Sequence, residues 1–278
     1  MNELKIGQAL DVLRTTSPLV HNITNYVTVN DCANALLAIG ASPIMSDEPE
    51  DVEDITSICS ALNINIGTLN QASIESMFRA GKKSAELGHP IVLDPVGAGA
   101  SVLRTKTAGD LLDTLPISLI RGNMSEAKAL ASGAASTRGV DVCPDDLVSE
   151  ENLVESVGFA CDLARRSNAL VAITGPIDIV ADEKRAYAIR NGSPLQETMT
   201  GAGCMLSGMC AAFLVAQPEN PFEAALASVV TMGLAGQIAE ERMVKHDGNG
   251  SYRTYLLDAL YTMKAETLVS RARVQRCL

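Results

Sequence analysis

Aromatic residues and basic charge are both scarce in this chain of 278 residues. Aromatic side chains make up only 3 % of the sequence, and tryptophan is absent. The core must therefore be built from Ala, Val, Leu, Ile and Met, whose compact side chains suit helices packed closely on a sheet. Lys and Arg number 22 against 33 Asp and Glu, a net charge of −11. This balance argues against a nucleic-acid partner, because such binding needs a basic surface that displaces counterions.

The sequence also lacks metal-binding cysteine spacings and secretion signals. Its seven cysteines are odd in number and none forms a CxxC motif, so we expect a reduced, cytoplasmic protein without structural zinc. The first fourteen residues are charged and have no apolar core, so no signal peptide is expected. Residues 198–218 carry no charge, but their Gly, Thr, Ser and Gln content favours a buried helix over a membrane span. No membrane partner is therefore expected.

Strand-like apolar runs alternate with helical patterns along most of the chain. The helical patterns lie at 3–15, 26–39, 51–60, 71–87, 102–114, 124–132 and 151–167. The strand-like runs lie at 43–45, 62–66, 90–94, 117–120 and 169–173. This alternation predicts an α/β fold, with a mostly parallel central sheet and helices on both faces. It extends over residues 1–278 without an obvious linker, which indicates a single domain.

The last hundred residues have a different pattern. Alternation over 177–180 and 186–189 predicts an antiparallel hairpin on the sheet edge. Three further helices are predicted near 203–216, 222–243 and 252–270. The polar segment 134–150 is expected to be a surface insertion.

Polar side chains follow several of the predicted strands. Asp94, Arg121, Glu126 and Thr174 all occupy such positions, and ligands of open parallel sheets bind at the carboxyl ends of the strands. Any one of them could merely cap the next helix, but the set predicts a site. Asp94 and Glu126 suggest Mg²⁺ held mostly through water beside phosphates, the alternative being two unrelated surface acids. His21, in a polar cluster between two helical patterns, is another candidate to line a site.

The turn Thr200-Gly201-Ala202-Gly203-Cys204 precedes the most apolar helical pattern of the chain. Glycines let successive backbone N–H groups point outward, and a helix N-terminus adds its positive dipole end. The turn is therefore a candidate anion hole for a transferring phosphoryl group. A glycine-rich turn that only lets the helix pack closely explains the same residues equally well. Walker A, GxSxG and HExxH motifs are absent, and the glycines at 97 and 99 lack the third glycine of a dinucleotide fingerprint.

These motifs resemble those of the hydroxyethylthiazole kinase family, in the ribokinase-like superfamily, over roughly residues 3–270. The most specific blocks are 21–28 and 37–46, and the matching blocks that complete the set are 65–69, 94–99, 121–126, 174–175 and 200–204. The resemblance implies a single-domain ribokinase-like fold and an ATP- and Mg²⁺-dependent kinase. The substrate would be the alcohol of hydroxyethylthiazole, in thiamine salvage. It also implies a homotrimer with active sites between subunits.

The resemblance implies which residues contact each of the two substrates. Met45 and Gly201 match positions that contact the thiazole, and Asn25 is expected to line the same pocket. Arg121 and Thr174 match positions that contact ATP. The adenine pocket is not identified by any motif, and we expect it among the helices after residue 222.

The resemblance also implies the metal site and the catalytic group. Asp94 and Glu126 match the Mg²⁺-associated acids. The anion hole is matched by Gly201, Ala202, Gly203 and Cys204. Ala202 replaces a commoner Thr, which is conservative where backbone N–H groups form the site, and Glu183 replaces an expected Gly in the hairpin turn.

Cys204 is the catalytic candidate, because related kinases usually carry Asp at this position. A helix N-terminus is expected to lower the pKa of the thiol, and bound phosphates to raise it again. A cysteine is therefore a mediocre general base, which phosphoryl transfer tolerates because it depends mostly on positioning and charge stabilisation.

Two other functions compete with thiazole phosphorylation. A ribokinase-like kinase for hydroxymethylpyrimidine or a sugar would usually have Asp at position 204, and a sugar site would need more polar groups than Val27, Ile44 and Met45 provide. A non-catalytic nucleotide-binding regulator on the same fold is disfavoured, because binding alone needs no metal-associated acids beside an anion hole.

Overall fold

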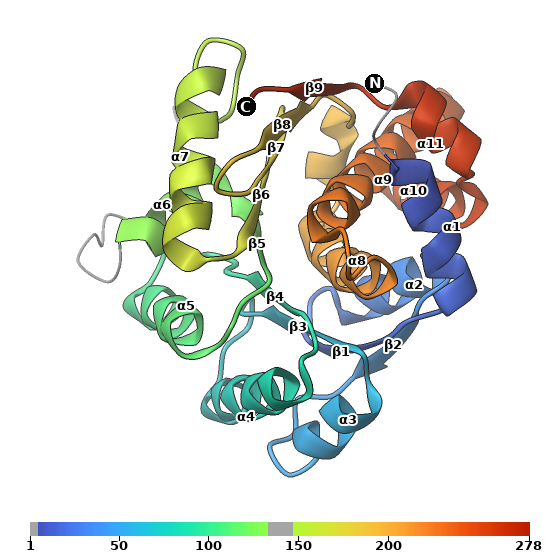
Figure 1. The fold of residues 1–278 in the computed structure, drawn as a ribbon. Helices are drawn as coiled ribbons and strands as arrows, with labels where there is room; N and C mark the ends of the chain where they lie inside the picture. Colours follow the sequence, from blue (N-terminus) through green and yellow to red (C-terminus); the bar gives the residue numbers. More distant parts are fainter. Residues whose placement is uncertain (1–4, 133–146) are drawn as a thin grey trace.

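The computed structural model describes residues 5–132 and 147–278, and within them nine strands form one sheet in the order β2-β1-β3-β4-β5-β6-β7-β8-β9 (Figure 1). The pairings from β2 to β6 are parallel, and those from β6 to β9 are antiparallel. The predicted parallel sheet with an antiparallel edge is confirmed. The strands are β1 (Leu19–Ile23), β2 (Ser42–Met45), β3 (Ala61–Asn65), β4 (Ile91–Asp94), β5 (Leu119–Asn123), β6 (Leu170–Thr174), β7 (Asp178–Ala181), β8 (Ala186–Ile189) and β9 (Val274–Arg276).

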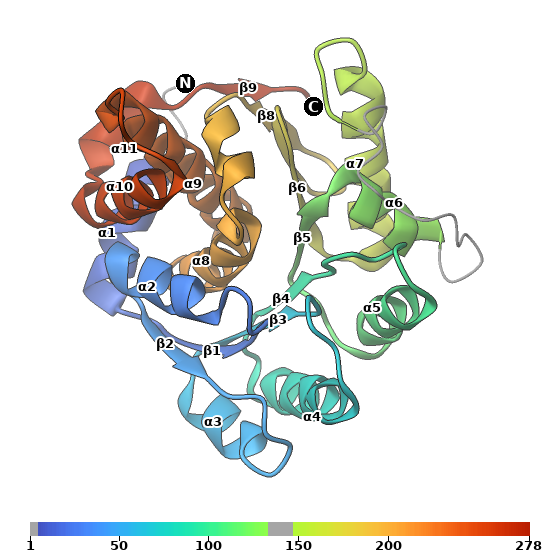
Figure 2. The ribbon, with the colours of Figure 1, turned by 180° about the vertical axis from the view of Figure 1, so that it is seen from behind.

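Helices cover both faces of the curved sheet (Figure 2). The larger core cluster lies on the face covered by α1 (Ile6–Thr16), α2 (Val29–Ile39), α8 (Ala202–Ala216), α9 (Pro221–Arg242), α10 (Asn249–Thr262) and α11 (Ala265–Arg271). The opposite face carries α3 (Val52–Ile58), α4 (Gln71–Leu87), α5 (Val102–Thr114), α6 (Met124–Ser132) and α7 (Leu153–Ser167). A short 3-10 helix, η3 (Pro194–Thr198), connects β8 to α8.

Two buried helices occupy the centre of the larger core. Most residues of α8 are buried, and the helix is apolar all round, as expected for an element covered on every side. The charge-free stretch predicted to be a buried helix is thus confirmed as one. Helix α9 is long and apolar enough to cross a membrane, but 83 % of its most apolar window is buried inside the protein. It is therefore packed as a core helix.

The first strand of the sheet was not predicted. Residues 22–25 were expected to lie between two helices, but β1 pairs with both β2 and β3 and is the second strand from one edge of the sheet. The sequence Leu-Val-His-Asn-Ile hides this strand, because two consecutive polar residues break the apolar run. The predicted helix over 252–270 is also wrong in detail, because α10 and α11 are separate helices. The short edge strand β9 was missed too, and most of the segment 134–150 lies outside the described residues.

His21 is buried in β1 and faces α3 rather than α8. Its Nδ1 lies 2.9 Å from Thr56 Oγ1, and its Nε2 lies 3.0 Å from the carbonyl oxygen of Ser46. Burial lowers the pKa of His21, and Nε2 donates to Ser46, because a carbonyl oxygen can only accept. Because both ring nitrogens are engaged, His21 holds β1 against α3 instead of lining the site described next.

Candidate functional site

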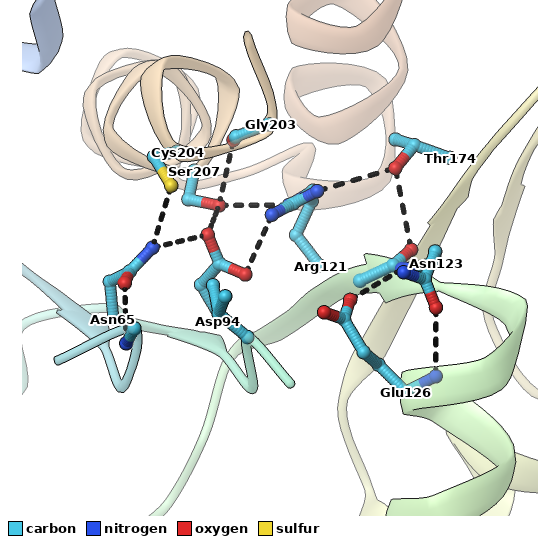
Figure 3. Close-up of polar contacts among 12 residues, drawn as sticks. Asn65, Asp94, Arg121, Asn123, Glu126, Thr174, Gly203, Cys204 and Ser207 are labelled. Carbon is cyan, nitrogen blue, oxygen red and sulfur yellow. Dashed lines mark hydrogen bonds and ion pairs between the residues drawn. The ribbon is translucent and has the colours of Figure 1, made fainter. Parts of the chain in front are cut away.

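The carboxyl ends of the central parallel strands meet beneath the first turn of α8. Register pairs Asn65 with Asp94 and Asn123 with Thr174, so four strand ends lie side by side. On β3, Leu62 and Ile64 join the core on the α4 side, and strand alternation directs Asn63 and Asn65 to the α8 side. The sheet thereby presents a row of polar side chains to one helix N-terminus (Figure 3).

The centre of this row is a buried ion pair between Asp94 and Arg121. Arg121 Nη2 donates to Asp94 Oδ1 at 2.6 Å, and the two side chains are only 6 % and 0 % exposed. Ser207 Oγ bridges the pair, since it accepts from Arg121 Nε at 2.9 Å and donates to Asp94 Oδ2 at 2.8 Å. Arg121 Nη1 also donates to Thr174 Oγ1 at 3.3 Å. Burial alone would lower the pKa of Arg121, but the carboxylates of Asp94 and Glu126 raise it above its ordinary value.

Glu126 lies beside the ion pair, in the first turn of α6. Its Oε1 accepts from the backbone N–H of Gly97 at 2.8 Å, and its Oε2 accepts from that of Asn123 at 2.9 Å. The Asn123 side chain in turn accepts from the Glu126 N–H at 2.8 Å, so the two residues cap α6 reciprocally. Burial raises the pKa of Glu126, and Arg121 partly opposes that effect. Glu126 therefore fixes the loop after β4 as well as adding negative charge near Arg121.

The glycines at the start of α8 allow two close contacts. Gly201 has φ +95°, and a Cβ there would lie 2.8 Å from Thr28 Cγ2. A Cβ on Gly203 would lie 2.5 Å from Arg121 Nη1, so the guanidinium occupies the space of a side chain. Because α8 begins directly after Gly201, the N–H groups of its first turn have no acceptor within the helix. The glycines therefore permit close packing, and the first turn lies at a positive helix end. The anion-hole role of this turn stays a prediction.

Cys204 lies in the same first turn of α8, next to Asn25 and Asn65. Its Sγ accepts from Asn25 Nδ2 and from Asn65 Nδ2, each at 3.2 Å. Burial raises the pKa of the Cys204 thiol, and the nearby Asp94 carboxylate raises it further. The pKa is therefore raised overall, whatever lowering the helix N-terminus supplies. The opposing effects of Arg121 and of the Asn25 hydrogen bond are smaller.

A cavity of about 410 Å³ opens beside Ala202 and Gly203. Its floor is apolar, with Leu206 on α8 and Val229 and Met232 on α9. Its walls are the loop 174–178 after β6 and the segment 190–197 around η3. The cavity therefore combines an apolar surface with backbone groups and one helix N-terminus.

Asp178 is a further acid in the wall of this cavity. Its Oδ1 accepts from the backbone N–H of Gly175 at 2.9 Å, which orders the loop after Thr174. Burial raises the pKa of Asp178 to about 7. The carboxyl therefore carries less than its full charge near neutral pH.

The structure brings most of the predicted site residues together. A contiguous group contains Asn25, Asp94, Arg121, Glu126, Thr174, Gly201, Ala202, Gly203 and Cys204. Met45 lies apart from these contacts, at the end of β2 in register with Asn22. It is half-buried and packs against the larger core cluster, so its predicted role stays a prediction.

Three residues of the site were not identified as functional from the sequence. Asn65 alternates with Asn63 in an otherwise apolar strand, a pattern that marks one polar face. Ser207 lies three residues after Cys204, and this spacing puts both side chains on one side of α8. No sequence pattern marked Asp178, because it lies against the cavity only once the chain has folded.

Comparisons with known proteins agree with this architecture. The model of the "Hydroxyethylthiazole kinase family" matches residues 10–266. The hydroxyethylthiazole kinase of Clostridium acetobutylicum is 52 % identical over 270 residues, which cover 97 % of this chain and 99 % of that protein. A solved structure of the hydroxyethylthiazole kinase protein of Pyrococcus horikoshii OT3 matches with a TM-score of 0.87 and 36 % identity, covering 98 % and 99 % of the two chains.

A more distant structure shares the fold. A ribokinase-like superfamily protein of Enterococcus faecalis V583 matches with a TM-score of 0.59 at 11 % identity, covering 91 % of this chain and 95 % of that one. The fold class predicted from the sequence is therefore confirmed.

The contact between Gly203 and Arg121 gives a stability prediction. Gly203→Ala should lower the free energy of unfolding by about 1–3 kcal/mol, because the added methyl group displaces a buried guanidinium. Gly109→Ala is the matched control, since Gly109 is a helical glycine on α5 and a Cβ there would meet no neighbouring group within 4 Å. The control should be neutral or more stable by up to about 1 kcal/mol. Urea unfolding measures both, and equal stability of the two variants would show that Arg121 does not fill this space.

Proposed function

The chain belongs to the hydroxyethylthiazole kinase family and is a phosphotransferase, and we propose that it transfers the γ-phosphoryl group of ATP to the alcohol of 4-methyl-5-(2-hydroxyethyl)thiazole. This reaction would serve thiamine salvage. One observation carries the proposal: the first turn of α8 lines the cavity through Ala202 and Gly203, carries Cys204, and packs through Gly203 against the Arg121 of the Asp94–Arg121 pair. A phosphoryl group in transit needs this combination of anion-binding groups and a nearby proton acceptor.

ATP fits the cavity beside Ala202 and Gly203. The floor of Leu206, Val229 and Met232 suits the flat adenine ring. This position would put the triphosphate toward Thr174 and the first turn of α8, where the dipole favours anions. The cavity involves α9, which supports the expectation that the adenine pocket lies among the helices after residue 222.

The thiazole would approach the same turn from the opposite side. Asn25 contacts Cys204 and Thr28 contacts Gly201 there, whereas Arg121 contacts both Gly203 and Thr174 on the nucleotide side. In this arrangement Asn25, Met45 and Gly201 line the thiazole pocket. Two substrates on opposite sides of one helix N-terminus would meet with the alcohol oxygen close to the γ-phosphorus, and such positioning supplies much of the rate of a group transfer.

The residues present fit Mg²⁺ bound through water and phosphate oxygens. Among the residues described, no cluster of three or more His, Cys, Asp or Glu side chains could hold a metal directly. Asp94 and Glu126 accept hydrogen bonds from protein donors on every carboxylate oxygen, which still leaves lone pairs for metal-bound water. Mg²⁺ bound there would help to neutralise the phosphate charge.

Cys204 is the proton acceptor in this proposal. As the alcohol oxygen forms its bond to the γ-phosphorus, the bond from that phosphorus to the bridging oxygen breaks, and ADP leaves. The alcohol proton passes to Cys204 Sγ, while Arg121 and the N–H groups of α8 stabilise the transferring oxygens. Because the pKa of this thiol is raised, little thiolate is present near neutral pH, so the step relies mainly on positioning.

We also propose that this single kinase domain assembles as a homotrimer, as the resemblance to the family implies, and the surroundings of the site support a subunit contact there. Tyr26 and Val27 follow Asn25 directly and are 79 % and 59 % exposed. Exposed apolar residues beside a substrate pocket are typical of surfaces that a neighbouring subunit covers.

We also propose a cytoplasmic location, with no nucleic-acid or membrane partner.

A substrate panel tests the proposed function. With Mg²⁺ and ATP, the protein should consume ATP much faster with hydroxyethylthiazole than with hydroxymethylpyrimidine or ribose. Excess EDTA should reduce consumption to background, because the phosphate charge is then no longer neutralised. Steady-state ATP consumption measures both effects. A preference for one of the other alcohols would assign the chain a different kinase activity, and nucleotide binding without any turnover would indicate a regulator.

Substitutions at Cys204 test the proton acceptor. Cys204→Ala should keep measurable activity, with kcat reduced by no more than about 10²- to 10⁴-fold, the usual cost of losing a general base. Cys204→Asp should keep or raise kcat, since a carboxylate is ionised at neutral pH and would accept both asparagine N–H groups. Turnover at saturating Mg-ATP of folded variants measures the effect. Wild-type activity in the Ala variant would make Cys204 a packing residue, and a folded but inactive Asp variant would show that the pocket rejects the charge.

A further inference from the structure

Asn65 contacts two groups of the site with one amide. Its Nδ2 donates to Asp94 Oδ2 at 2.7 Å and to Cys204 Sγ at 3.2 Å (Figure 3). Its Oδ1 accepts from Asn25 Nδ2 at 3.0 Å and from the backbone N–H of Gly67 at 2.9 Å. The amide therefore uses both of its N–H donors and both acceptor positions. Since Asn65 is 1 % exposed, these contacts fix it in one orientation.

The same contacts make Cys204 Sγ an acceptor of two N–H groups. One comes from Asn65 and the other from Asn25, which is itself oriented by Asn65. Hydrogen bonds donated to sulfur favour its thiolate over its thiol form. Together with the charge of Arg121 and a hydrogen bond from Thr28, they oppose the burial of Cys204 and the charge of Asp94, both of which favour the thiol. The buried Cys32 thiol on α2 also faces Cys204. Asn65 thus donates one N–H group to the Asp94 carboxylate and one to Cys204 Sγ, the two groups that can be anionic.

We propose that Asn65 is a positioning residue for phosphoryl transfer, which bridges Cys204 Sγ and Asp94 with one amide and increases the small fraction of Cys204 that is thiolate. This inference rests on the proposed function. The Asn65 amide itself neither gains nor loses a proton: the alcohol proton goes to Cys204 Sγ, and the electron pair of the broken bond leaves with ADP. Asn65 acts through Cys204 and does not need to touch either substrate.

Asn63 offers a matched control on the same strand. It lies two residues before Asn65 on the same face of β3, and it is fully buried. Its Nδ2 donates to Asn22 Oδ1 at 3.0 Å. Asn22 is on β1, which flanks β3 on the side opposite to β4 and Asp94. Asn63→Leu and Asn65→Leu therefore bury the same apolar side chain in place of the same amide, and only the second removes donors from Cys204.

The test is the pH titration of the Cys204 thiolate, together with kcat as a function of pH. Thiolate formation is followed by ultraviolet absorbance, as the difference between each protein and the same protein carrying Cys204→Ala. In Asn65→Leu the midpoint should rise by about one pH unit or more, and kcat at neutral pH should fall by about tenfold, because one pKa unit is a tenfold change in thiolate. The KM for ATP should change little. Asn63→Leu should keep the wild-type midpoint.

A second variant covers the case in which Asn65→Leu does not fold. Asn65→Asp keeps the shape of the side chain, removes both N–H donors and adds charge beside Asp94, so its midpoint should rise at least as far. Equal midpoints in the Asn65 and Asn63 variants, or an unchanged kcat in a folded Asn65 variant, would overturn the proposal. The thiolate titration needs no substrate, so it is independent of the substrate panel: inactivity of the wild-type protein toward hydroxyethylthiazole would refute the proposed function instead.

Discussion

The buried ion pair of Asp94 and Arg121 is the interaction on which the rest of this site depends. Removing two charges from water is costly, and only good geometry with further hydrogen bonds can offset the cost. Here Asn65, Ser207 and Thr174 supply those bonds. Each comes from a different element, so satisfying the pair fixes β3, β4, β5, β6 and α8 relative to one another. The arrangement that stabilises the charges is also the one that orders the site.

Close packing of small residues makes this arrangement possible. Gly203 lets the Arg121 guanidinium lie against the backbone of α8, and Gly201 lets the preceding turn lie against Thr28. Gly233 plays the same part in α9, where a Cβ would lie 2.8 Å from the carbonyl oxygen of Asn191. Because aromatic residues are scarce, small side chains fill the core. The helices therefore approach the sheet and the loops closely, and backbone N–H groups of α8 lie at the site.

Much of the fold and part of the site could be predicted from the sequence, for identifiable reasons. Alternating strands and helices predict the parallel sheet, and residues that follow strands, such as Asp94 and Arg121, meet at its carboxyl edge. Strand β1 could not be predicted, because buried His21 and Asn22 are stabilised by partners from distant segments that no local pattern reveals. The raised pKa of Cys204 was missed for a related reason: the helix N-terminus is visible in the sequence, but the burial and the proximity of Asp94 arise only on folding.

A double-mutant cycle on the ion pair tests this account most directly. Asp94→Asn and Arg121→Met should each lower the free energy of unfolding by about 3–5 kcal/mol, because each leaves one charge buried without its partner. The double variant should lose less than the sum of the two, by about 1–3 kcal/mol, as expected for residues in direct contact within one network. Urea unfolding of the four proteins gives this interaction energy. Additive losses, within about 0.5 kcal/mol, would contradict the claim that the pair organises the site.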